Sequence, residues 1–348
     1  MTDPTSEPSR NQYYAELRPH SLAALWRSLH SLVPNFPQSA FQPALWRYAD
    51  IRPLLLRSGE VISAEEAVRR VLILENPAAS GSASITSTLY SGLQLILPGE
   101  VAPAHRHTQS AFRLIIEGSG AFTTVGGERF PMSPGDLVLT PSWEWHDHGN
   151  AGTEPVVWLD GLDIPLIRSL EAGFAESANA TQQPIMTPAG TNLLTWGAGL
   201  RIPAEQDRPF RRVERFMYPY AIWRPALDSL ARSGSADASG VFSLEFTNPV
   251  DGGTIMPTMS GFCHLLPAGR TTQTVRRTDG RVFHVVEGTG RIRSGDFTAA
   301  VTARDTFVVP PWHPLQISAD SPLVLFSYSD RATQERLGIW RADTVTAA

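Results

Sequence analysis

The sequence predicts a mainly β protein with two successive β barrels, preceded and separated by helical segments. From about residue 86, and again from about residue 243, short apolar runs are broken by Gly or Pro roughly every 8 to 12 residues, as in antiparallel sandwiches and barrels. The two β-rich parts share the phrases "IIEGSGAF" (115–122) and "VVEGTGRI" (285–292), which align at an offset of 170 residues. Such a repeat favours duplication over two unrelated β domains.

Composition limits the class of protein and its partners. The chain has 348 residues, of which 42% are hydrophobic and 18% charged, and a net charge of -5, so it is long enough for two folded domains. It has no basic run, no apolar stretch of transmembrane length, and a polar N-terminus, "MTDPTSEPSRNQYY". A single cysteine, Cys263, fits a reducing compartment. We therefore expect a cytoplasmic protein that binds neither nucleic acid nor membrane.

Two helical stretches are expected before the first β part. Residues 21–33, "SLAALWRSLHSLV", have apolar side chains at helical spacing, with Ser21 as the expected N-cap. Residues 63–77, "SAEEAVRRVLILENP", begin with Ser63 and Glu66 as a capping box, change into a strand at "RVLILE", and end at Pro77.

Two further helices are expected between the β parts, over 166–178 and over 221–234, "AIWRPALDSLARSG". The predicted organisation is a helical N-terminal segment (1–84), a metal-binding barrel (85–165), a helical linker (166–240), a second barrel without metal (241–341) and a tail (342–348).

The first β part contains a histidine pattern typical of a metal site. His105 and His107 are two residues apart, so on a strand both imidazoles leave the same face. Their phrase, "PGEVAPAHRH", and the later phrase "GDLVLTPSWEWHDHGN" with His146 have the spacing of the two cupin motifs. The chain therefore resembles a bicupin, which implies two double-stranded β-helix (jelly-roll) barrels and three histidines converging in the first. Neutral imidazole suits Fe(II), Zn, Cu, Mn or Ni.

Two positions depart from the usual cupin pattern. The glutamate ligand common in cupins would lie near Ala111 or Phe112, where no acidic residue stands, and Trp143 replaces the usual glycine of the second motif. The sequence therefore predicts three histidine ligands with positions left open for substrate, oxygen or water.

The second copy lacks this ligand set. At the offset of 170, the residues on the three histidine positions are Val275, Arg277 and Gln316. Other histidines lie nearby, but not at ligand spacing. We expect the second barrel to hold no metal and to act as scaffold, oligomer interface or wall of the first site.

Charged and polar side chains are expected beside the three histidines. Arg113 shares the facing of His105 and His107 by strand alternation, His148 shares that of His146, and Gln94 lies on the preceding strand. An arginine inside a barrel can hold a carboxylate through two parallel hydrogen bonds, so an anionic, planar ligand is expected. The alternatives are an outward, solvated Arg113 side chain or a salt bridge from Arg113 to a loop carboxylate.

Longer phrases identify a closer resemblance. "LQLILPGEVAPAHRHTQSAFR", "TPSWEWHDHGN", "VVWLDGLDIPL", "RFMYPYA" and "LFSYSDRATQERLGIWR" resemble the gentisate 1,2-dioxygenase family, which includes salicylate and 1-hydroxy-2-naphthoate dioxygenases, over about residues 69–341. The resemblance implies Fe(II) on the three histidines and ring opening of a 2-hydroxybenzoate by O2, between the carboxyl- and hydroxyl-bearing carbons. It also implies a homotetramer acting in aromatic catabolism.

The resemblance assigns roles to several residues. It implies that Arg113, His148 and Gln94 hold the substrate carboxylate and hydroxyl, with His148 also able to act as acid or base. It places an arginine, Arg69 or its neighbour Arg70, toward the rest of the ring.

Three more residues complete the predicted substrate site. The resemblance places Asp160 toward the ring as well. Tyr90 and Gly92, two residues apart on a strand that should border the pocket, are also predicted to bind the substrate. Tyr90 is expected to influence which ring substituent is preferred.

Gentisate is the favoured substrate, and salicylate, a 5-substituted salicylate and 1-hydroxy-2-naphthoate are the alternatives. A non-catalytic bicupin that binds a small acid is the alternative from another class. A cupin isomerase or decarboxylase is disfavoured by the missing glutamate and by the "HRHTQ" phrase.

Overall fold

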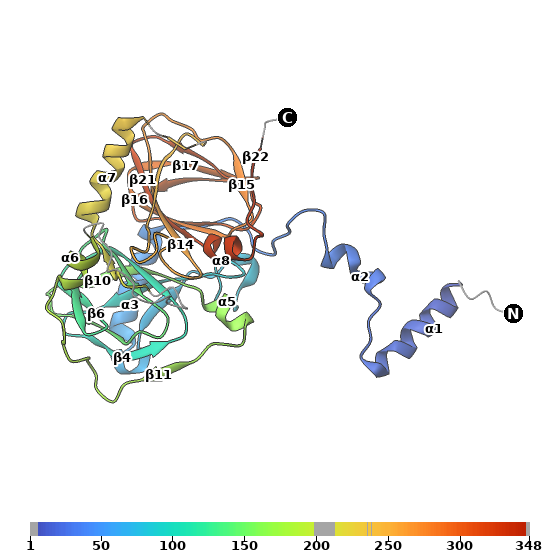
Figure 1. The fold of residues 1–348 in the computed structure, drawn as a ribbon, viewed down its shortest axis with the longest axis horizontal. Coiled ribbons are helices and arrows are strands. Elements are labelled where there is room, and N and C mark those ends of the chain that lie inside the picture. Colours follow the sequence, from blue (N-terminus) through green and yellow to red (C-terminus); the bar gives the residue numbers. More distant parts are fainter. Residues whose placement is uncertain (1–5, 198–212, 235, 238, 346–348) are drawn as a thin grey trace. The chain divides into compact units, whose positions relative to one another are not determined.

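The computed structural model describes residues 6–197, 213–234, 236–237 and 239–345 (Figure 1). Residues 1–38 form one unit and residues 39–348 another. The first unit contains two helices, α1 (Glu7–Leu17) and α2 (Leu25–Leu32). The helices of the second unit are α3 (Tyr48–Val61), α4 (Ala64–Ala67), α5 (Ile164–Ser169), α6 (Thr191–Gly197), α7 (Tyr220–Ser233) and α8 (Arg331–Arg336). Each described helix is too short or too polar to span a membrane.

The first barrel consists of two antiparallel sheets. The six-stranded sheet has the order β12-β8-β5-β10-β3-β2 and the five-stranded sheet the order β11-β4-β9-β6-β7. The strands are β2 (Arg70–Ile73), β3 (Tyr90–Ile96), β4 (Val101–His107), β5 (Ala111–Glu117), β6 (Ala121–Val125), β7 (Glu128–Pro131), β8 (Leu137–Thr140), β9 (His146–Asn150), β10 (Val156–Leu162), β11 (Ala175–Ser177) and β12 (Met217–Tyr218).

The second barrel repeats this arrangement. Its six-stranded sheet has the order β1-β19-β16-β21-β14-β13, and it faces a three-stranded sheet, β18-β17-β20, and a pair, β15-β22. The strands are β1 (Ala44–Trp46), β13 (Phe242–Glu245), β14 (Ser260–Leu266), β15 (Val275–Arg277), β16 (Arg281–Glu287), β17 (Thr289–Ser294), β18 (Phe297–Thr302), β19 (Thr306–Val309), β20 (Gln316–Ala319), β21 (Leu323–Ser329) and β22 (Ala342–Thr344).

The two six-stranded sheets share one hydrophobic core. Leu93 and Leu95 of β3 turn outward from the first barrel and belong to the same buried cluster as Phe326 and Tyr328 of β21. The Tyr328 hydroxyl donates to the backbone oxygen of Tyr90 at 2.9 Å. The second barrel therefore supports the strand that carries several predicted site residues.

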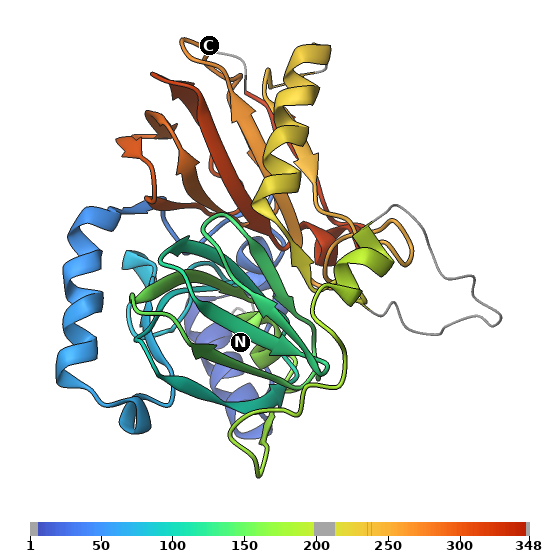
Figure 2. The same ribbon diagram turned by 90° about the vertical axis from the view of Figure 1, so that its left-hand side faces the viewer.

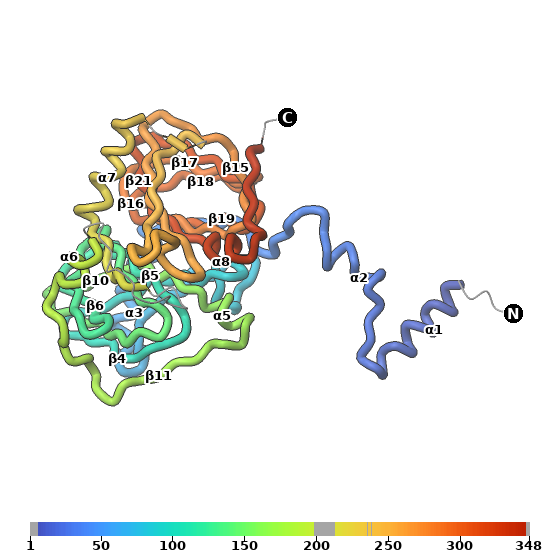
Figure 3. Tube along the Cα trace, in the orientation of Figure 1, coloured from blue at the N-terminus to red at the C-terminus, as the bar shows by residue number. Residues whose placement is uncertain are grey.

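The linker helix α7 runs beside the second barrel, next to β13 and β14 (Figures 2 and 3). The Arg224 guanidinium pairs with Glu287 of the second barrel at 3.0 Å. The Trp223 indole donates to the backbone oxygen of Gly135 in the first barrel at 3.0 Å.

The duplication is visible in equivalent turn hydrogen bonds. Gly99 donates to Asn150, and Gly269 donates to Ala319, both at 2.8 Å. Trp143 and Trp312 each have a positive φ, 65° and 64°, and donate to His107 and Arg277 respectively. An arginine guanidinium covers each of these indoles, Arg106 at 4.5 Å and Arg276 at 4.8 Å from the ring centroid.

These pairs correct the predicted alignment. The offset is 170 residues up to the histidine pair, but 169 from Trp143 onward, because the second copy has one residue fewer in between. The position of His146 is therefore occupied by Leu315, which exchanges hydrogen bonds with Val275, and not by Gln316 as predicted.

Two predicted helices need correction. α2 begins three residues later than a helix capped by Ser21 would, because Ser21 has a left-handed φ of 55° and its amide bonds back to Arg18, so Ser21 does not cap the helix. The stretch 166–178 is only partly helical: after α5, Ala175–Ser177 forms β11 and pairs with β4.

Other predicted elements are confirmed. The Ser63 side chain accepts from the Glu66 amide at 3.1 Å and begins α4, and the chain then enters β2. α7 matches the helix expected over 221–234.

Several short strands lie in segments predicted as helical or as tail. β1 and β2 fall within 1–84, β11 and β12 within 166–240, and β22 within 342–348. Each extends a barrel sheet through cross-strand hydrogen bonds that its own sequence pattern is too short to indicate. Residues 198–212 of the predicted linker lie outside the described residues.

Candidate functional site

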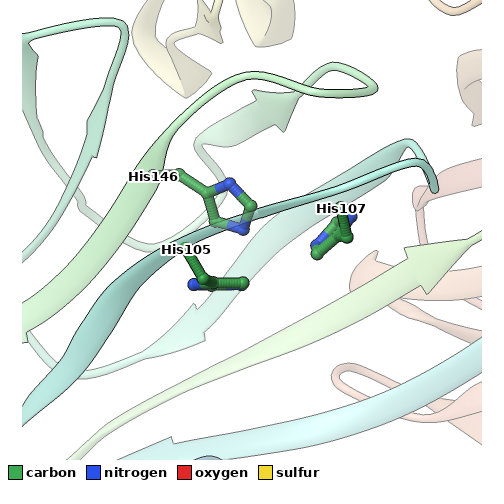
Figure 4. A group of neighbouring side chains, drawn as sticks. All are labelled: His105, His107 and His146. Carbon is green, nitrogen blue, oxygen red and sulfur yellow. The ribbon is translucent and has the colours of Figure 1, made fainter. Parts of the chain in front are cut away.

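Three histidines meet inside the first barrel (Figure 4). His105 and His107 lie on β4, and His146 lies on β9, directly opposite His105 in the antiparallel pair. One nitrogen from each ring lies within 4.8 Å of the others, and the ring centroids of His105 and His146 are 4.0 Å apart. Among the described residues, these three form the group that could hold a metal ion.

The backbone fixes the orientation of each ring. The Nδ1 atoms of His105, His107 and His146 donate to the backbone oxygens of residues 103, 109 and 144, at 2.9, 2.8 and 2.8 Å. With Nδ1 protonated, the lone pair is on Nε2. Nε2 of His146 is fully buried and has no hydrogen-bond partner among the described residues, as expected of an atom that binds a metal.

The electrostatic surroundings keep the imidazoles neutral. Burial, and then the neighbouring Arg69, lower the pKa of His105 to about 3. Burial lowers the pKa of His107 to about 4, and that of His146 falls well below its usual range for the same reason. Neutral imidazole is the form that binds a transition metal.

Arg113 points into the same interior. It lies on β5, is 4% exposed, and its Nε is 3.5 Å from an Asp160 carboxylate oxygen. Its Nη1 contacts the Thr140 hydroxyl, while its Nε makes no hydrogen bond to a described residue. The barrel therefore contains a buried guanidinium whose Nε donor makes no hydrogen bond to a described residue, which is suited to an anion.

His148 is buried beside this arginine. Its Nδ1 is 2.8 Å from the Thr123 hydroxyl, and its Nε2 has no partner among the described residues. Its ring lies 5.6 Å from that of His146 and 5.7 Å from Trp158. Burial and Arg113 lower its pKa well below the usual range, so His148 is neutral at pH 7.

Asp160 lies on β10 opposite Arg113 and Gly92. It accepts from the Trp158 indole at 3.2 Å. Burial raises its pKa to about 6, while Arg113 opposes the rise, so the carboxyl group is still mostly ionised at pH 7.

Of the two adjacent arginines, the structure brings Arg69 to the site. The Arg69 guanidinium contacts Nδ1 of His105, and burial followed by Arg113 lowers its pKa to about 10. Arg70 instead pairs with Glu100 at 2.8 Å and donates to the backbone oxygen of Ile62.

β3 forms the adjoining wall. Tyr90, Gly92 and Gln94 are alternate residues of this strand, so they lie on the same face. Gln94 is 3% exposed and stands opposite Trp158 in the sheet. A side chain at Gly92 would approach the Tyr90 hydroxyl to 2.9 Å, so glycine is what lets the Tyr90 ring fold over the strand. Burial and then Asp160 raise the pKa of Tyr90.

Sequence reasoning missed the residues that hold these groups in place. Thr123 stands directly opposite His148 on β6, and Thr140 stands opposite Ala111 on β8. Trp158 lies within the phrase "VVWLDGLDIPL", which does not show that its indole donates to Asp160. Cross-strand pairing decides these contacts, and a single strand's sequence does not show its partner.

The second barrel has no comparable group among its described residues. Val275, Arg277 and Leu315 occupy the three histidine positions. The nearby His264 and His284 are satisfied by hydroxyl groups, at 2.8–3.0 Å, rather than facing one another.

Comparison with known proteins agrees with this geometry. Residues 92–162 match the cupin domain family. The chain is 45% identical to gentisate 1,2-dioxygenase 1 of Aquipseudomonas alcaligenes, over 97% of each chain. It is 33% identical to the 5-aminosalicylate 1,2-dioxygenase of Comamonas sp., over 94% of this chain and 88% of the relative.

Solved structures give the same relationship. The salicylate 1,2-dioxygenase of Pseudoaminobacter salicylatoxidans, solved with gentisate, matches with a TM-score of 0.92 and 33% identity, covering 99% of this chain and 96% of that one. The two-barrel fold, the three-histidine cluster and this similarity over nearly the whole length all indicate the same family. The chain belongs to the gentisate 1,2-dioxygenase family of ring-cleaving bicupin dioxygenases.

Proposed function

We propose that this protein is an Fe(II)-dependent dioxygenase that opens the ring of gentisate, between the carbons bearing the carboxyl and the 2-hydroxyl group, with O2. The observation that carries this proposal is the convergence of three Nε2-directed imidazoles with the buried Arg113 and His148 inside one barrel. A neutral ligand set keeps the charge of a divalent metal undiminished, which suits a dianionic substrate. When bound, Fe(II) would pass electron density from the ring to O2, so that no outside reductant is consumed.

The side chains have distinct roles in this proposal. Arg113 binds the substrate carboxylate through its Nε donor, which makes no hydrogen bond to a described residue and lies 3.5 Å from Asp160. Thr123 directs its hydroxyl toward the Met132 sulfur, 3.3 Å away, and accepts from Nδ1 of His148. Nε2 of His148 then carries a lone pair that can accept the proton of the 2-hydroxyl group.

Gentisate is proposed over other 2-hydroxybenzoates for two reasons. Relatives at 45% and 37% identity are gentisate 1,2-dioxygenases, and Asp160 and Arg69 supply further polar groups beside Arg113. A buried site that hydrogen-bonds a hydroxyl group rejects analogues without it, by factors that can reach about 10⁴.

Oxygen uptake on a panel of ring substrates tests the proposal. Gentisate should give the highest kcat/KM, ahead of salicylate, 5-aminosalicylate and 1-hydroxy-2-naphthoate, and Asp160→Ala should narrow the gap between gentisate and salicylate. A kcat/KM for salicylate or a 5-substituted salicylate equal to that of gentisate would overturn the substrate assignment. Binding of these acids without oxygen uptake by the iron-loaded protein would favour a non-catalytic small-acid-binding role.

The oligomeric state is proposed to be a homotetramer. The number of four follows from the family resemblance. A surface for association is offered by the apolar side of α2, where Leu25, Trp26, Leu29 and Leu32 are each at least 42% exposed. Exposed apolar stripes of this kind commonly form subunit contacts. Light scattering should give a mass near four chains, and the double variant Trp26→Glu, Leu29→Glu should dissociate it. A monomeric wild-type protein would contradict this assignment.

A further inference from the structure

The interior of the second barrel contains a cavity of about 100 Å³. It occupies the place that the three-histidine site has in the first barrel, since Val275 and Leu315 line it and pair as His105 and His146 do. Its other walls come from the strands β13, β14, β16, β20 and β21 and from the segment before β13.

Two arginines stand at former ligand positions in this cavity. Arg277 is the equivalent of His107, because Trp312 and Trp143 donate to their respective backbone oxygens. Arg281 is the equivalent of Ala111, near which the usual cupin glutamate would lie. The equivalence is fixed by the preceding amides: that of Gly280 donates to Asp330 at 2.8 Å, as that of Ser110 donates to Asp163 at 2.9 Å.

Arg281 is buried with unused donors. It is 6% exposed, and its Nε and Nη2 atoms have no hydrogen-bond partner among the described residues. Burial and then Arg277 lower its pKa to about 9, and Asp279 opposes the effect. Arg277 differs, because it forms two hydrogen bonds of 2.8 Å to the Asp279 carboxylate.

The histidine and the carboxylate of the cavity already have hydrogen-bond partners. His264 bonds to Ser243 at 2.9 Å and to Ser327 at 2.8 Å, and burial lowers its pKa to about 4, so it is neutral. The Asp237 carboxylate at the rim accepts from the Ser239 and Val241 amides and from hydroxyl groups. Among the described residues that line the cavity, Arg281 therefore has the buried donors, Nε and Nη2, that are without a partner.

Apolar side chains surround this guanidinium. They are Val241, Leu266, Val275, Phe283, Leu315, Ile317 and Leu325. Such walls exclude water, which strengthens a charge-assisted hydrogen bond and makes an unpaired buried charge costly. A ligand that satisfies both features has an anionic end and an apolar body.

We propose that the second barrel is a separate binding site for a small organic carboxylate, with the carboxylate on Arg281 and the apolar body against Phe283 and Leu325. In this view, the duplicated cupin site changed from binding a cation to binding an anion when arginines and apolar residues replaced its ligands. A carboxylate accepts two parallel hydrogen bonds from Nε and Nη2, the atoms that are without partners.

Calorimetric titration of the intact, metal-loaded protein with benzoate tests this proposal. Wild type should bind two benzoates per chain, one in each barrel. Arg113→Leu should abolish the first-barrel site only, while Arg281→Leu and Arg281→Gln should abolish the second site or weaken it at least about 10-fold. Arg293→Leu, at an exposed arginine on β17 of the same barrel, should keep both sites.

The variants must also be shown to fold, and a second probe tests the apolar wall. Arg281→Leu should have a melting temperature equal to or above that of wild type, because it removes an unpaired buried charge.

Acetate should bind the second site at least about 10-fold more weakly than benzoate, since it lacks the apolar body.

One benzoate per chain, lost in Arg113→Leu and kept in Arg281→Leu, would overturn the proposal. So would two sites that both persist in Arg281→Leu and Arg281→Gln. Neither outcome bears on oxygen uptake with gentisate. The proposed second site and the proposed dioxygenase function can therefore fail independently of each other.

Discussion

At the scale of single residues, the candidate metal site depends on ring orientation. Each of His105, His107 and His146 donates through Nδ1 to a backbone oxygen two residues away. These contacts are local, so each ring is held with Nε2 toward the centre before any metal binds. The arrangement explains why three neutral imidazoles remain together in a buried interior.

Replacing any of these three histidines with alanine should remove the metal. Each substitution should reduce bound iron and oxygen uptake on gentisate to background, while the far-UV circular dichroism spectrum is kept, because two imidazoles hold iron too weakly. Gln316→Ala in the second barrel is the control and should retain full iron by elemental analysis. Full metal and activity in one of the three variants would exclude that residue as a ligand.

Arg113, the proposed partner of the substrate carboxylate in the first barrel, is the second feature at the scale of single residues. Arg113→Ala should raise KM and lower kcat for gentisate, with a loss of about 2 kcal/mol, or roughly 30-fold in kcat/KM, because a charge-assisted pair is removed. Arg113→Lys should recover only part of this loss, since an ammonium group lacks the planar fork. A wild-type kcat/KM in Arg113→Ala would place this side chain outside the substrate's reach.

At the scale of elements, the tight turns of the barrels constrain the backbone. Gly118 has a φ of 86° just after β5, and a methyl group there would lie 2.2 Å from the backbone oxygen of Pro155. Gly288 is its equivalent after β16, with a φ of 85° and a similar contact to Pro322. The "EGxG" repeat therefore marks a turn in which two backbone segments touch.

Alanine substitutions can separate backbone strain from steric contact at these turns. Gly99 also has a positive φ, 78°, but a methyl group there would meet nothing within 4 Å. Gly99→Ala should cost about 1–2 kcal/mol in the free energy of unfolding, from the left-handed conformation alone. Gly118→Ala should cost about 1–3 kcal/mol more, from the added clash. The measurement is urea denaturation of both variants. Equal losses in the free energy of unfolding would contradict the role assigned to the Pro155 contact.

At the scale of the whole molecule, the barrels are not independent. One hydrophobic cluster includes side chains of both six-stranded sheets, among them Leu95, Phe112, Phe326 and Tyr328. The site in the first barrel is thus supported by the second, whose β21 holds the backbone of Tyr90. We infer that the metal site and the second barrel are lost together on unfolding.

Acid should destabilise this molecule partly through the second barrel. His284 is 3% exposed, and burial and then Arg304 lower its pKa to about 3. The unfolded chain, with a histidine pKa of about 6.5, takes up this proton first, so stability is full above about pH 6.5 and falls as the pH decreases toward the folded-state value. The loss should be about 2 kcal/mol by pH 5.

His284→Gln removes the titrating group and should flatten this dependence. The measurement is the free energy of unfolding in urea at several pH values between 5 and 7.5, with slopes compared rather than absolute stabilities. Equal slopes for the variant and wild type would show that His284 does not contribute to acid sensitivity.

The sequence alone determined the features that depend on local alternation. Strand period placed His105 and His107 on one face, and the repeated "EGxG" phrase revealed the duplication. The capping box at Ser63 is likewise read within one turn of chain. These features need no knowledge of neighbouring strands, because side-chain direction and capping are set by residues two or three positions away.

Only the tertiary structure decided the features that depend on register between strands. It brought Arg69, which follows the positive φ of Val68, to His105 and sent Arg70 to Glu100. It also placed Leu315, one residue from the predicted Gln316, at the equivalent of the third histidine. A one-residue slip reverses the face of every side chain after it, and bulges and turns that cause such slips are set by contacts far apart in sequence.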